Sequence, residues 1–256
     1  MIKVVFFDVD GTLLSHSRKE VPESSRAALE KLKEAGIKRV LATGRHMVEL
    51  ERLPIRDIDF DAYILLNGQL CLDGRKEVFY KNPIIGQEKE HILKIFHEKI
   101  MPIVLVEKDR MYINYIDDQV RMAQIAISTP LPKIGEYQDG EIYLAVAYVA
   151  KEEEQNMKAQ LPNCNITRWN EFGMDIGSKN SGKVAGIQEF LNQNHILLEE
   201  TMAFGDGEND IEMLKFVHTG VAMGNAEEPV KDSADYTTAH IDEDGVEKAL
   251  RYFGVI

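Results

Sequence analysis

The sequence predicts an α/β fold, in which a Rossmann-like, doubly wound parallel sheet forms the core and an α+β domain is inserted into it. Two observations lead to this expectation. Strand-like and helix-like segments alternate along residues 1–81 and again along residues 178–256, as in a parallel sheet with crossover helices. Along residues 82–177, strand-like segments instead follow one another in pairs, which is typical of antiparallel pairing. We therefore expect a discontinuous core domain, 1–81 with 178–256, and an inserted domain at 82–177.

The opening segment, Ile2 to Phe7, predicts a strand buried on both faces, because its residues are mostly apolar and β-branched or aromatic. Asp8 and Asp10 end this run. Side chains alternate along an extended chain, so both acids can point the same way past the carboxyl end of the strand, where open α/β sheets bind ligands. At roughly 4 Å and an effective dielectric of about 20, two carboxylates repel by about 4 kcal/mol, so the pair shares a proton or holds a cation. A simpler interpretation is a solvated turn in which Gly11 supplies a positive φ.

The remaining segments continue both patterns. A proline near its start and a glycine after its end mark a helix between Val21 and Gly36, and a second helix follows Arg45 and ends before Pro54. Further core strands are predicted at 37–42, 62–66, 201–204, 220–223 and 236–238, with a hairpin at 69–80 and helices at 183–194, 211–217 and 245–252. In the inserted domain, helices are predicted at 87–99, 118–127 and 151–160, and strands at 103–106, 111–115, 142–149, 165–169 and 173–176.

Composition and charge argue against several classes of function and of binding partner. The chain has 256 residues, 44% of them hydrophobic, which is ordinary for a globular protein with a substantial core. With 30 basic and 43 acidic residues, its net charge of −13 argues against nucleic acid or an anionic membrane as a partner. Only two cysteines occur, Cys71 and Cys164, so neither a disulfide framework nor a thiolate metal site is indicated. No segment approaches the ~18 apolar residues of a membrane span, and we expect a cytoplasmic protein.

Four segments carry chemically useful side chains at the ends of strands or the starts of helices. They are Asp8 with Asp10, Thr43 with Gly44, the Ser181-Gly182-Lys183 helix start, and Asp206 with Asn209 and Asp210. Because carboxyl ends of parallel strands meet at one edge, we expect these segments to converge. The four aspartates would concentrate too much negative charge there without a hard divalent cation, and their oxygens suit Mg²⁺.

A magnesium site of this kind implies a phosphate. Thr43 offers a hydroxyl and a backbone N–H at a helix N-terminus, and Lys183 offers a positive charge, so the two can cradle a tetrahedral anion. With that charge screened, Asp8 can attack phosphorus and form an aspartyl-phosphate. Asp10 can protonate the leaving oxygen and later deprotonate the attacking water.

Each segment also has a simpler interpretation. Thr43 and Gly44 can form an ordinary strand-to-helix turn, Lys183 can be a solvated lysine of a first helical turn, and residues 206–210 can be a capping acid with a polar loop.

Three other patterns in the sequence partly match known binding motifs. Residues 177–184 match a phosphate-binding P-loop except that Val184 replaces the Ser or Thr that holds Mg²⁺, which leaves a nucleotide-binding module as an alternative. Gly205-x-Gly207 begins like a dinucleotide fingerprint but has Asp210 where the third glycine belongs. Neither acidic loop is an EF-hand, because Leu13 and Ile211 occupy the position that requires glycine.

With these residues in view, the chain resembles the haloacid-dehalogenase-like phosphatase superfamily, and within it the Cof-type sugar-phosphatase subgroup. The segments that resemble the four superfamily motifs are 8–12, 43–45, Lys183 and 205–214, and the segments 67–68, 220–226 and 242–246 resemble stretches of the subgroup. The residue before Lys183 is Gly182 and the residue after it is Val184, whereas the superfamily more often has lysine followed by glycine.

The resemblance implies a role for each matching residue. Asp8 would be the nucleophile and a Mg²⁺ ligand, and Asp10 the acid/base, binding Mg²⁺ through its carbonyl. Asp206 would be the third ligand, and Asp210 would order the shell around the metal. The implied phosphate-binding residues are Val9, Thr43, Gly44, Lys183 and Asn209.

The resemblance also implies that residues 82–177 form a cap that closes over the substrate and selects the leaving group. Within this cap, Glu107, Arg110, Asn114 and Arg121 are either sugar contacts or ordinary surface residues. We therefore predict a Mg²⁺-dependent phosphatase whose partner is a small-molecule phosphomonoester such as a sugar phosphate. The alternatives are a phosphomutase of the same superfamily, a nucleotide-binding module, and a non-catalytic sensor of phosphorylated metabolites.

Overall fold

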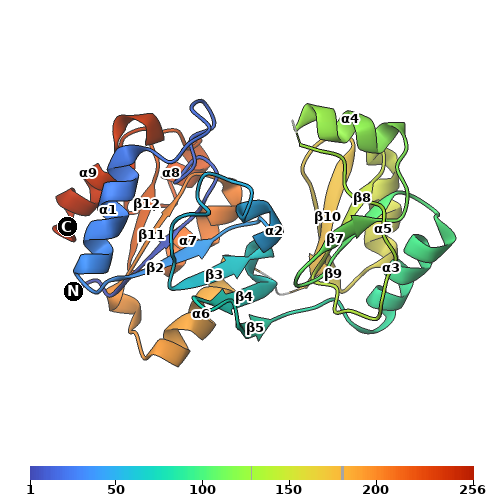
Figure 1. Cartoon of the computed structure of the whole chain (residues 1–256), viewed down its shortest axis with the longest axis horizontal. Coiled ribbons are helices and arrows are strands. Elements are labelled where there is room, and N and C mark those ends of the chain that lie inside the picture. Colours follow the sequence, from blue (N-terminus) through green and yellow to red (C-terminus); the bar gives the residue numbers. More distant parts are fainter. Residues whose placement is uncertain (128, 180–181) are drawn as a thin grey trace. The chain divides into compact units, whose positions relative to one another are not determined.

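The structure is a computed structural model, and it describes residues 1–127, 129–179 and 182–256. The chain forms two compact units (Figure 1). The first comprises Met1–Tyr80 and Gly182–Ile256, and the second comprises Lys81–Ser181. Within the described ranges, no helix is long and apolar enough to cross a membrane.

An eight-stranded sheet forms the centre of the first unit, in the order β13-β12-β11-β1-β2-β3-β4-β5. Its strands are β1 (Val4–Phe7), β2 (Lys38–Ala42), β3 (Ala62–Leu65), β4 (Leu70–Asp73), β5 (Val78–Lys81), β11 (Thr201–Gly205), β12 (Thr219–Ala222) and β13 (Tyr236–Thr237). Every pairing from β13 to β3 is parallel, and β4 runs antiparallel to β3. The predicted doubly wound parallel core is confirmed, with the predicted hairpin strands β4 and β5 at one edge.

The register of β1 explains how distant segments meet. Phe7, the last residue of β1, is aligned with Leu41 of β2 and with Phe204 of β11. The backbone N–H of the next residue, Asp8, donates to the carbonyl of Phe204 at 3.0 Å. Since the three strands are parallel and in register, the segments that follow them leave the sheet at the same edge.

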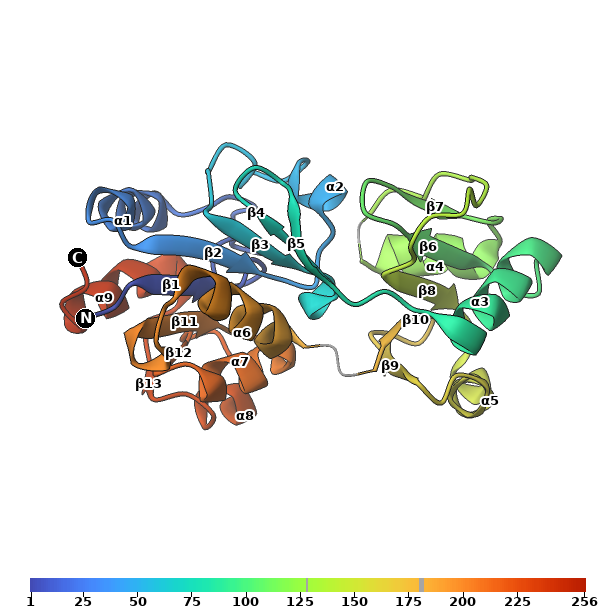
Figure 2. The same cartoon turned by 90° about the horizontal axis from the view of Figure 1, so that it is seen from below.

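Helices cover both faces of this sheet. They are α1 (Glu23–Glu34), α2 (Met47–Leu50), α6 (Lys183–Asn194), α7 (Ile211–Phe216), α8 (Glu228–Lys231) and α9 (Gly245–Tyr252), with short 3-10 helices at Leu66–Gly68, Leu198–Glu200, Glu208–Asp210 and Ile241–Glu243. Helices α6 and α7 lie on one face of the sheet (Figure 2). There Phe6 packs edge-on against Phe190 of α6, in a buried cluster that also includes Met213 of α7. Phe7 and Phe204 point to the other face and stack at 5.3 Å between ring centroids. The short helix α8 was not predicted.

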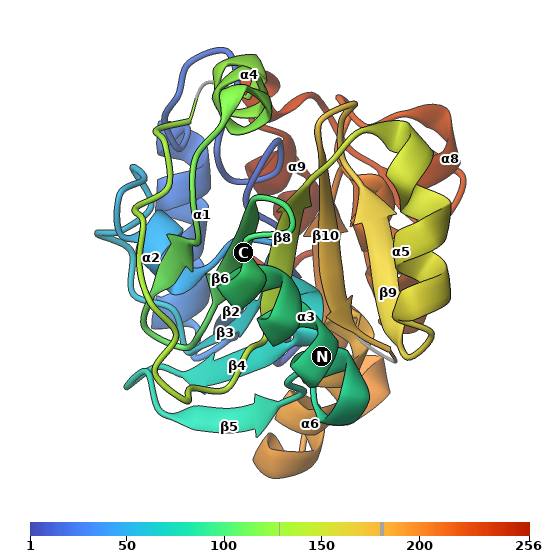
Figure 3. The same cartoon turned by 90° about the vertical axis from the view of Figure 1, so that its right-hand side faces the viewer.

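The second unit is built on a five-stranded antiparallel sheet in the order β7-β6-β8-β10-β9 (Figure 3). Its elements are α3 (Gly86–Glu98), β6 (Ile103–Val106), β7 (Met111–Ile113), α4 (Asp118–Ala126), β8 (Leu144–Tyr148), the 3-10 helix Lys151–Glu153, α5 (Glu154–Gln160), β9 (Cys164–Arg168) and β10 (Gly173–Ser178). Buried apolar residues of α3 and α5 share one core with inward-facing residues of β6, β8 and β10. The predicted α+β character of the inserted segment is confirmed.

Candidate active site

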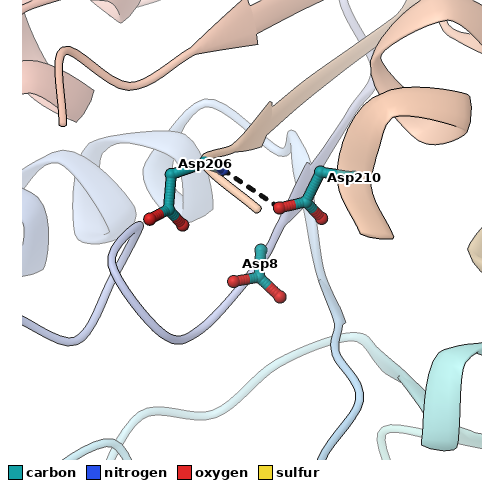
Figure 4. Close-up of side chains that lie close together, drawn as sticks. All are labelled: Asp8, Asp206 and Asp210. Atoms are coloured by element: carbon teal, nitrogen blue, oxygen red, sulfur yellow. Dashed lines mark hydrogen bonds between the residues drawn. The ribbon is translucent and has the colours of Figure 1, made fainter. Parts of the chain in front are cut away.

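Three aspartates cluster at the carboxyl edge of the parallel sheet (Figure 4). Asp8 follows β1, while Asp206 and Asp210 follow β11, and oxygens from the three carboxylates lie within 4.8 Å of one another. Gly11 makes this approach possible. It has φ +79°, and a Cβ built on it would lie only 2.0 Å from Oδ2 of Asp206. A side chain at position 11 would therefore displace Asp206 from the cluster.

Lys183, the first residue of α6, joins two of these acids. Its Nζ donates to Oδ1 of Asp8 at 2.7 Å and to Oδ1 of Asp210 at 2.6 Å. The Lys183 side chain is only 1% exposed, and that of Asp210 is fully buried. An ammonium buried at a helix start, where the helix dipole disfavours it, is stabilised by these two carboxylates.

Asp210 also organises its own loop. Its Oδ2 accepts the backbone N–H of Asp206 at 3.0 Å (Figure 4). The same oxygen accepts the backbone N–H of Gly207 at 2.9 Å. Because its carboxylate is bonded to Lys183 and to two backbone amides, Asp210 fixes both the lysine and the turn that carries Asp206.

Asp206 is held by two donors. Its Oδ1 accepts the hydroxyl of Thr12 at 3.0 Å, and its Oδ2 accepts Nδ2 of Asn225 at 3.1 Å. The same Asn225 amide donates to the carbonyl of Gly11 at 2.9 Å. Asn225 was not predicted as a site residue. Its position in a loop following β12, at the same sheet edge, was the signal that could have identified it.

The electrostatics of the cluster favour a divalent cation. Burial raises the pKa of Asp8 to about 8, with Lys183 opposing the shift and Asp210 adding to it, and burial raises the pKa of Asp206 to about 6. Although burial lowers it, the pKa of Lys183 is raised overall because Asp210 and Asp8 stabilise the ammonium. When all are ionised, the three carboxylates and the lysine carry a net charge of −2, which one divalent cation would neutralise. Oxygen-only donors also match a hard cation.

Asp10 lies outside this carboxylate cluster. Its two carboxylate oxygens accept hydrogen bonds from Nε and Nη2 of Arg45 at 2.6 and 2.8 Å, which makes a bidentate ion pair. The side chains of both residues are 30% exposed. Arg45 also lies 3.8 Å from Glu49. The Arg45 partner was not predicted, because only the tertiary fold brings residues 10 and 45 together.

Thr43 and Gly44 follow β2 at the same edge, but one expectation about them is wrong. The backbone N–H of Thr43 donates to the carbonyl of Ile64 at 2.8 Å, extending the β2 to β3 pairing, so it is not free to bind an anion. The helix predicted here is also later and shorter, since α2 begins at Met47 and is capped by His46. The Thr43 hydroxyl accepts the backbone N–H of Arg45 at 3.2 Å and can still donate its own proton.

Val9, Asn209 and the P-loop-like segment are the remaining predicted features of the site. Val9 is buried directly after Asp8, and its carbonyl accepts backbone N–H groups of the following turn. Asn209 is exposed, and its Nδ2 donates to Oδ1 of Asn67 at 3.1 Å. The P-loop-like segment 177–184 includes residues 180 and 181, which lie outside the described residues, while Lys183 itself is bonded to the aspartates.

The four polar residues considered in the second unit are mostly structural. Glu107 accepts Nε and Nη2 of Arg110, each at 2.8 Å, and also the hydroxyl of Tyr112. Asn114 bonds to backbone groups of Ile103 and Met101. Arg121 lies exposed on α4.

Known proteins are similar to this chain in sequence and in fold. The chain matches the family described as haloacid dehalogenase-like hydrolase over residues 5–250. It is 31% identical to the “Putative phosphatase YkrA” of Bacillus subtilis (strain 168), over 99% of this chain and 98% of that protein. BT1666 from Bacteroides thetaiotaomicron, a phosphatase of the HAD superfamily, is 35% identical with a TM-score of 0.89, covering 100% of this chain and 96% of that one. The HAD subclass IIB sugar phosphatase BT4131 is 36% identical with a TM-score of 0.82, covering 99% and 100%.

The chain therefore belongs to the haloacid dehalogenase-like hydrolase family. Within that family it is a phosphatase, an enzyme that hydrolyses phosphoric monoesters. The predicted superfamily and enzyme class are confirmed.

Proposed function

We propose that this enzyme is a Mg²⁺-dependent phosphatase of small phosphorylated metabolites, sugar phosphates among them, and that it acts through a phosphorylated Asp8. The observation that carries the proposal is the contact of Asp8 with Lys183 beside two further aspartates, at the edge where α/β sheets bind ligands. The similarity to a sugar phosphatase supports the substrate class.

Asp8 suits the role of nucleophile because the fold fixes both its backbone and its side chain. Its backbone N–H is bonded to β11, and its Oδ1 accepts the Lys183 ammonium. Attack through Oδ2 keeps the lysine contact, while a bond forms between Oδ2 and phosphorus and the bond from phosphorus to the leaving oxygen breaks. Lys183 then also lies close to the transferring phosphoryl group, where its charge stabilises the developing negative charge.

Asp10 suits the role of acid and base. Its carboxylate is two residues beyond Asp8 and partly exposed, so that once its contact with Arg45 opens it can reach both the leaving group and solvent. It gives its proton to the leaving oxygen in the first step. In the second step it takes a proton from the water that attacks the aspartyl-phosphate, which releases inorganic phosphate and restores Asp8.

Asp8, Asp206 and the carbonyl of Asp10 would hold Mg²⁺, with Asp210 ordering this shell, and the bound cation would screen the phosphate's charge from the carboxylates. The Thr43 hydroxyl, the backbone N–H groups of Val9 and Gly44, and the amide of Asn209 would bind the phosphate oxygens together with Lys183. Residues 82–177 would act as the cap that selects the leaving group.

The test is the substitution Asp8→Asn, assayed by phosphate release from an aryl phosphate and from a panel of sugar phosphates with Mg²⁺. We expect turnover to fall by at least about 10³-fold, since the amide is a poor nucleophile. The matched control Asp59→Asn, at an exposed position of the same unit, should keep wild-type activity. Wild-type turnover in the Asp8→Asn variant would remove Asp8 as nucleophile. With a sugar phosphate that carries a radiolabelled phosphoryl group, transfer of that group to a second hydroxyl of the sugar instead of to water would make the enzyme a phosphomutase.

A further inference from the structure

The turn after β3 has an unusual backbone. Leu66, Asn67 and Gly68 are three consecutive residues with positive φ, at 52°, 51° and 88°. Residues with a Cβ rarely adopt this conformation, and a bulky residue such as leucine does so less readily than asparagine. Such strain persists only where surrounding contacts fix it, and it is enriched at functional sites.

Backbone hydrogen bonds fix this turn against the Thr43 to Arg45 segment. The N–H of Asn67 donates to the carbonyl of Thr43 at 3.0 Å, and the N–H of Leu66 donates to the carbonyl of Arg45 at 3.2 Å. The two hydrogen bonds hold the residues immediately before and after Gly44. They therefore set the direction of the Gly44 backbone.

The side chain of Asn67 makes two further contacts at the same place. Its Oδ1 accepts Nδ2 of Asn209 at 3.1 Å. Its amide also lies over Gly44, where a built Cβ would be 3.2 Å from Nδ2 of Asn67. Gly68 then packs against the start of α6, since a Cβ on it would lie 2.2 Å from the carbonyl of Gly182. The turn thus touches the segments that carry Gly44, Asn209 and Lys183.

We propose that Asn67 is a positioning residue for the phosphate site, which acts by holding the amide of Asn209 and the backbone of Gly44 in one fixed arrangement. This inference rests on the proposed function. Asparagine meets both demands of the position. It tolerates the left-handed backbone better than other residues with a Cβ, and its neutral carboxamide places no negative charge beside a phosphate dianion.

The experiment compares Asn67→Gly, Asn209→Ala and the double variant in the full-length enzyme. Glycine removes the amide and leaves a residue for which φ 51° is unstrained, so the fold is retained. Lys76→Gly is the matched control, because Lys76 also has positive φ, at 64°, but lies exposed in a different turn. The readouts are KM and kcat for an aryl phosphate and the inhibition constant of inorganic phosphate.

We expect Asn67→Gly to raise KM and the phosphate inhibition constant about five- to tenfold, with a smaller change in kcat, as for the loss of one hydrogen bond between neutral groups. In the Asn209→Ala background the same substitution should have a smaller effect, because the contact with Asn209 is already lost and only the part that acts through Gly44 remains. Wild-type KM and phosphate inhibition in Asn67→Gly would overturn the inference, as would an equally large effect in both backgrounds. A wild-type enzyme that releases no phosphate would instead overturn the proposed function.

Discussion

Replacing Asp206 with asparagine is expected to stabilise the metal-free protein while abolishing its activity. The carboxylate of Asp206 lies close to those of Asp8 and Asp210, and burial raises its pKa to about 6. Asparagine has nearly the same shape and keeps an oxygen for the Asn225 amide, while its own amide can donate to the Thr12 hydroxyl. The substitution therefore removes one negative charge with little change in packing.

The magnitude follows from the pKa shift. A carboxyl whose pKa is higher in the folded state binds its proton more tightly there, so stability present below about pH 4 is lost as the pH rises through about 6. About two units at ~1.4 kcal/mol each give an upper value of ~3 kcal/mol. Because the carboxyl is partly exposed, solvent screening reduces this to about 1–2 kcal/mol. The free energy of unfolding of the variant should then exceed that of the wild type by about 1–2 kcal/mol at pH 8. Near pH 4 the two proteins should be equally stable.

The assay is thermal and urea unfolding of both proteins in a chelator, at pH 4.5 and pH 8. The expected gain at pH 8 corresponds to a melting temperature about 2–8 °C higher. Adding Mg²⁺ at about a hundred times its dissociation constant should stabilise the wild type by about 2.7 kcal/mol and leave the variant unchanged. A variant that is less stable than the wild type at pH 8, or equally shifted at both pH values, would refute the electrostatic reasoning.

Three further substitutions test other parts of the site. Lys183→Met leaves the Asp8 and Asp210 carboxylates without their cation, so it should lower the free energy of unfolding by about 3–5 kcal/mol at pH 8 and by less at pH 5, measured by urea denaturation. Asn225→Ala removes a donor to Asp206, and titration calorimetry should find Mg²⁺ binding about tenfold weaker or more. Arg45→Lys keeps the charge but cannot make the bidentate contact with Asp10, so kcat/KM for an aryl phosphate should fall about tenfold. Unchanged kinetics would show that Arg45 has no part in orienting Asp10.

The features that could be predicted from the sequence are those set by local pattern. Apolar runs ended by glycine, proline or acids mark the strands and helices of both units, and the alternation of these elements in the first unit predicts a parallel sheet. The convergence of Asp8 with Asp206 follows from the same reasoning, because adjacent parallel strands in register must end at one edge. The structure bears out that convergence.

The features that could not be predicted depend on which side chains meet across the fold. Arg45 with Asp10, Asn225 with Asp206 and Asn67 with Asn209 are pairs separated by 35, 19 and 142 residues, and no local spacing marks them. The error at Thr43 has the same origin. Its backbone N–H is used by β3, a strand whose pairing with β2 extends one residue beyond the apolar run.

In the proposed mechanism, Asp8 as nucleophile and Asp10 as acid and base would meet different chemical demands, and their surroundings differ accordingly. A nucleophile must lie in line with phosphorus, and Asp8 is buried at the end of a central strand with its backbone and side chain both bonded. An acid that later becomes a base must exchange protons with a leaving group and then with water, and Asp10 lies two residues further on, in a partly exposed turn. Arg45 holds the Asp10 carboxylate through two hydrogen bonds, and in the proposed mechanism this partly exposed contact would have to open before Asp10 donates its proton. The two-residue spacing thus gives one acid the rigidity of the sheet and the other the accessibility of the loop.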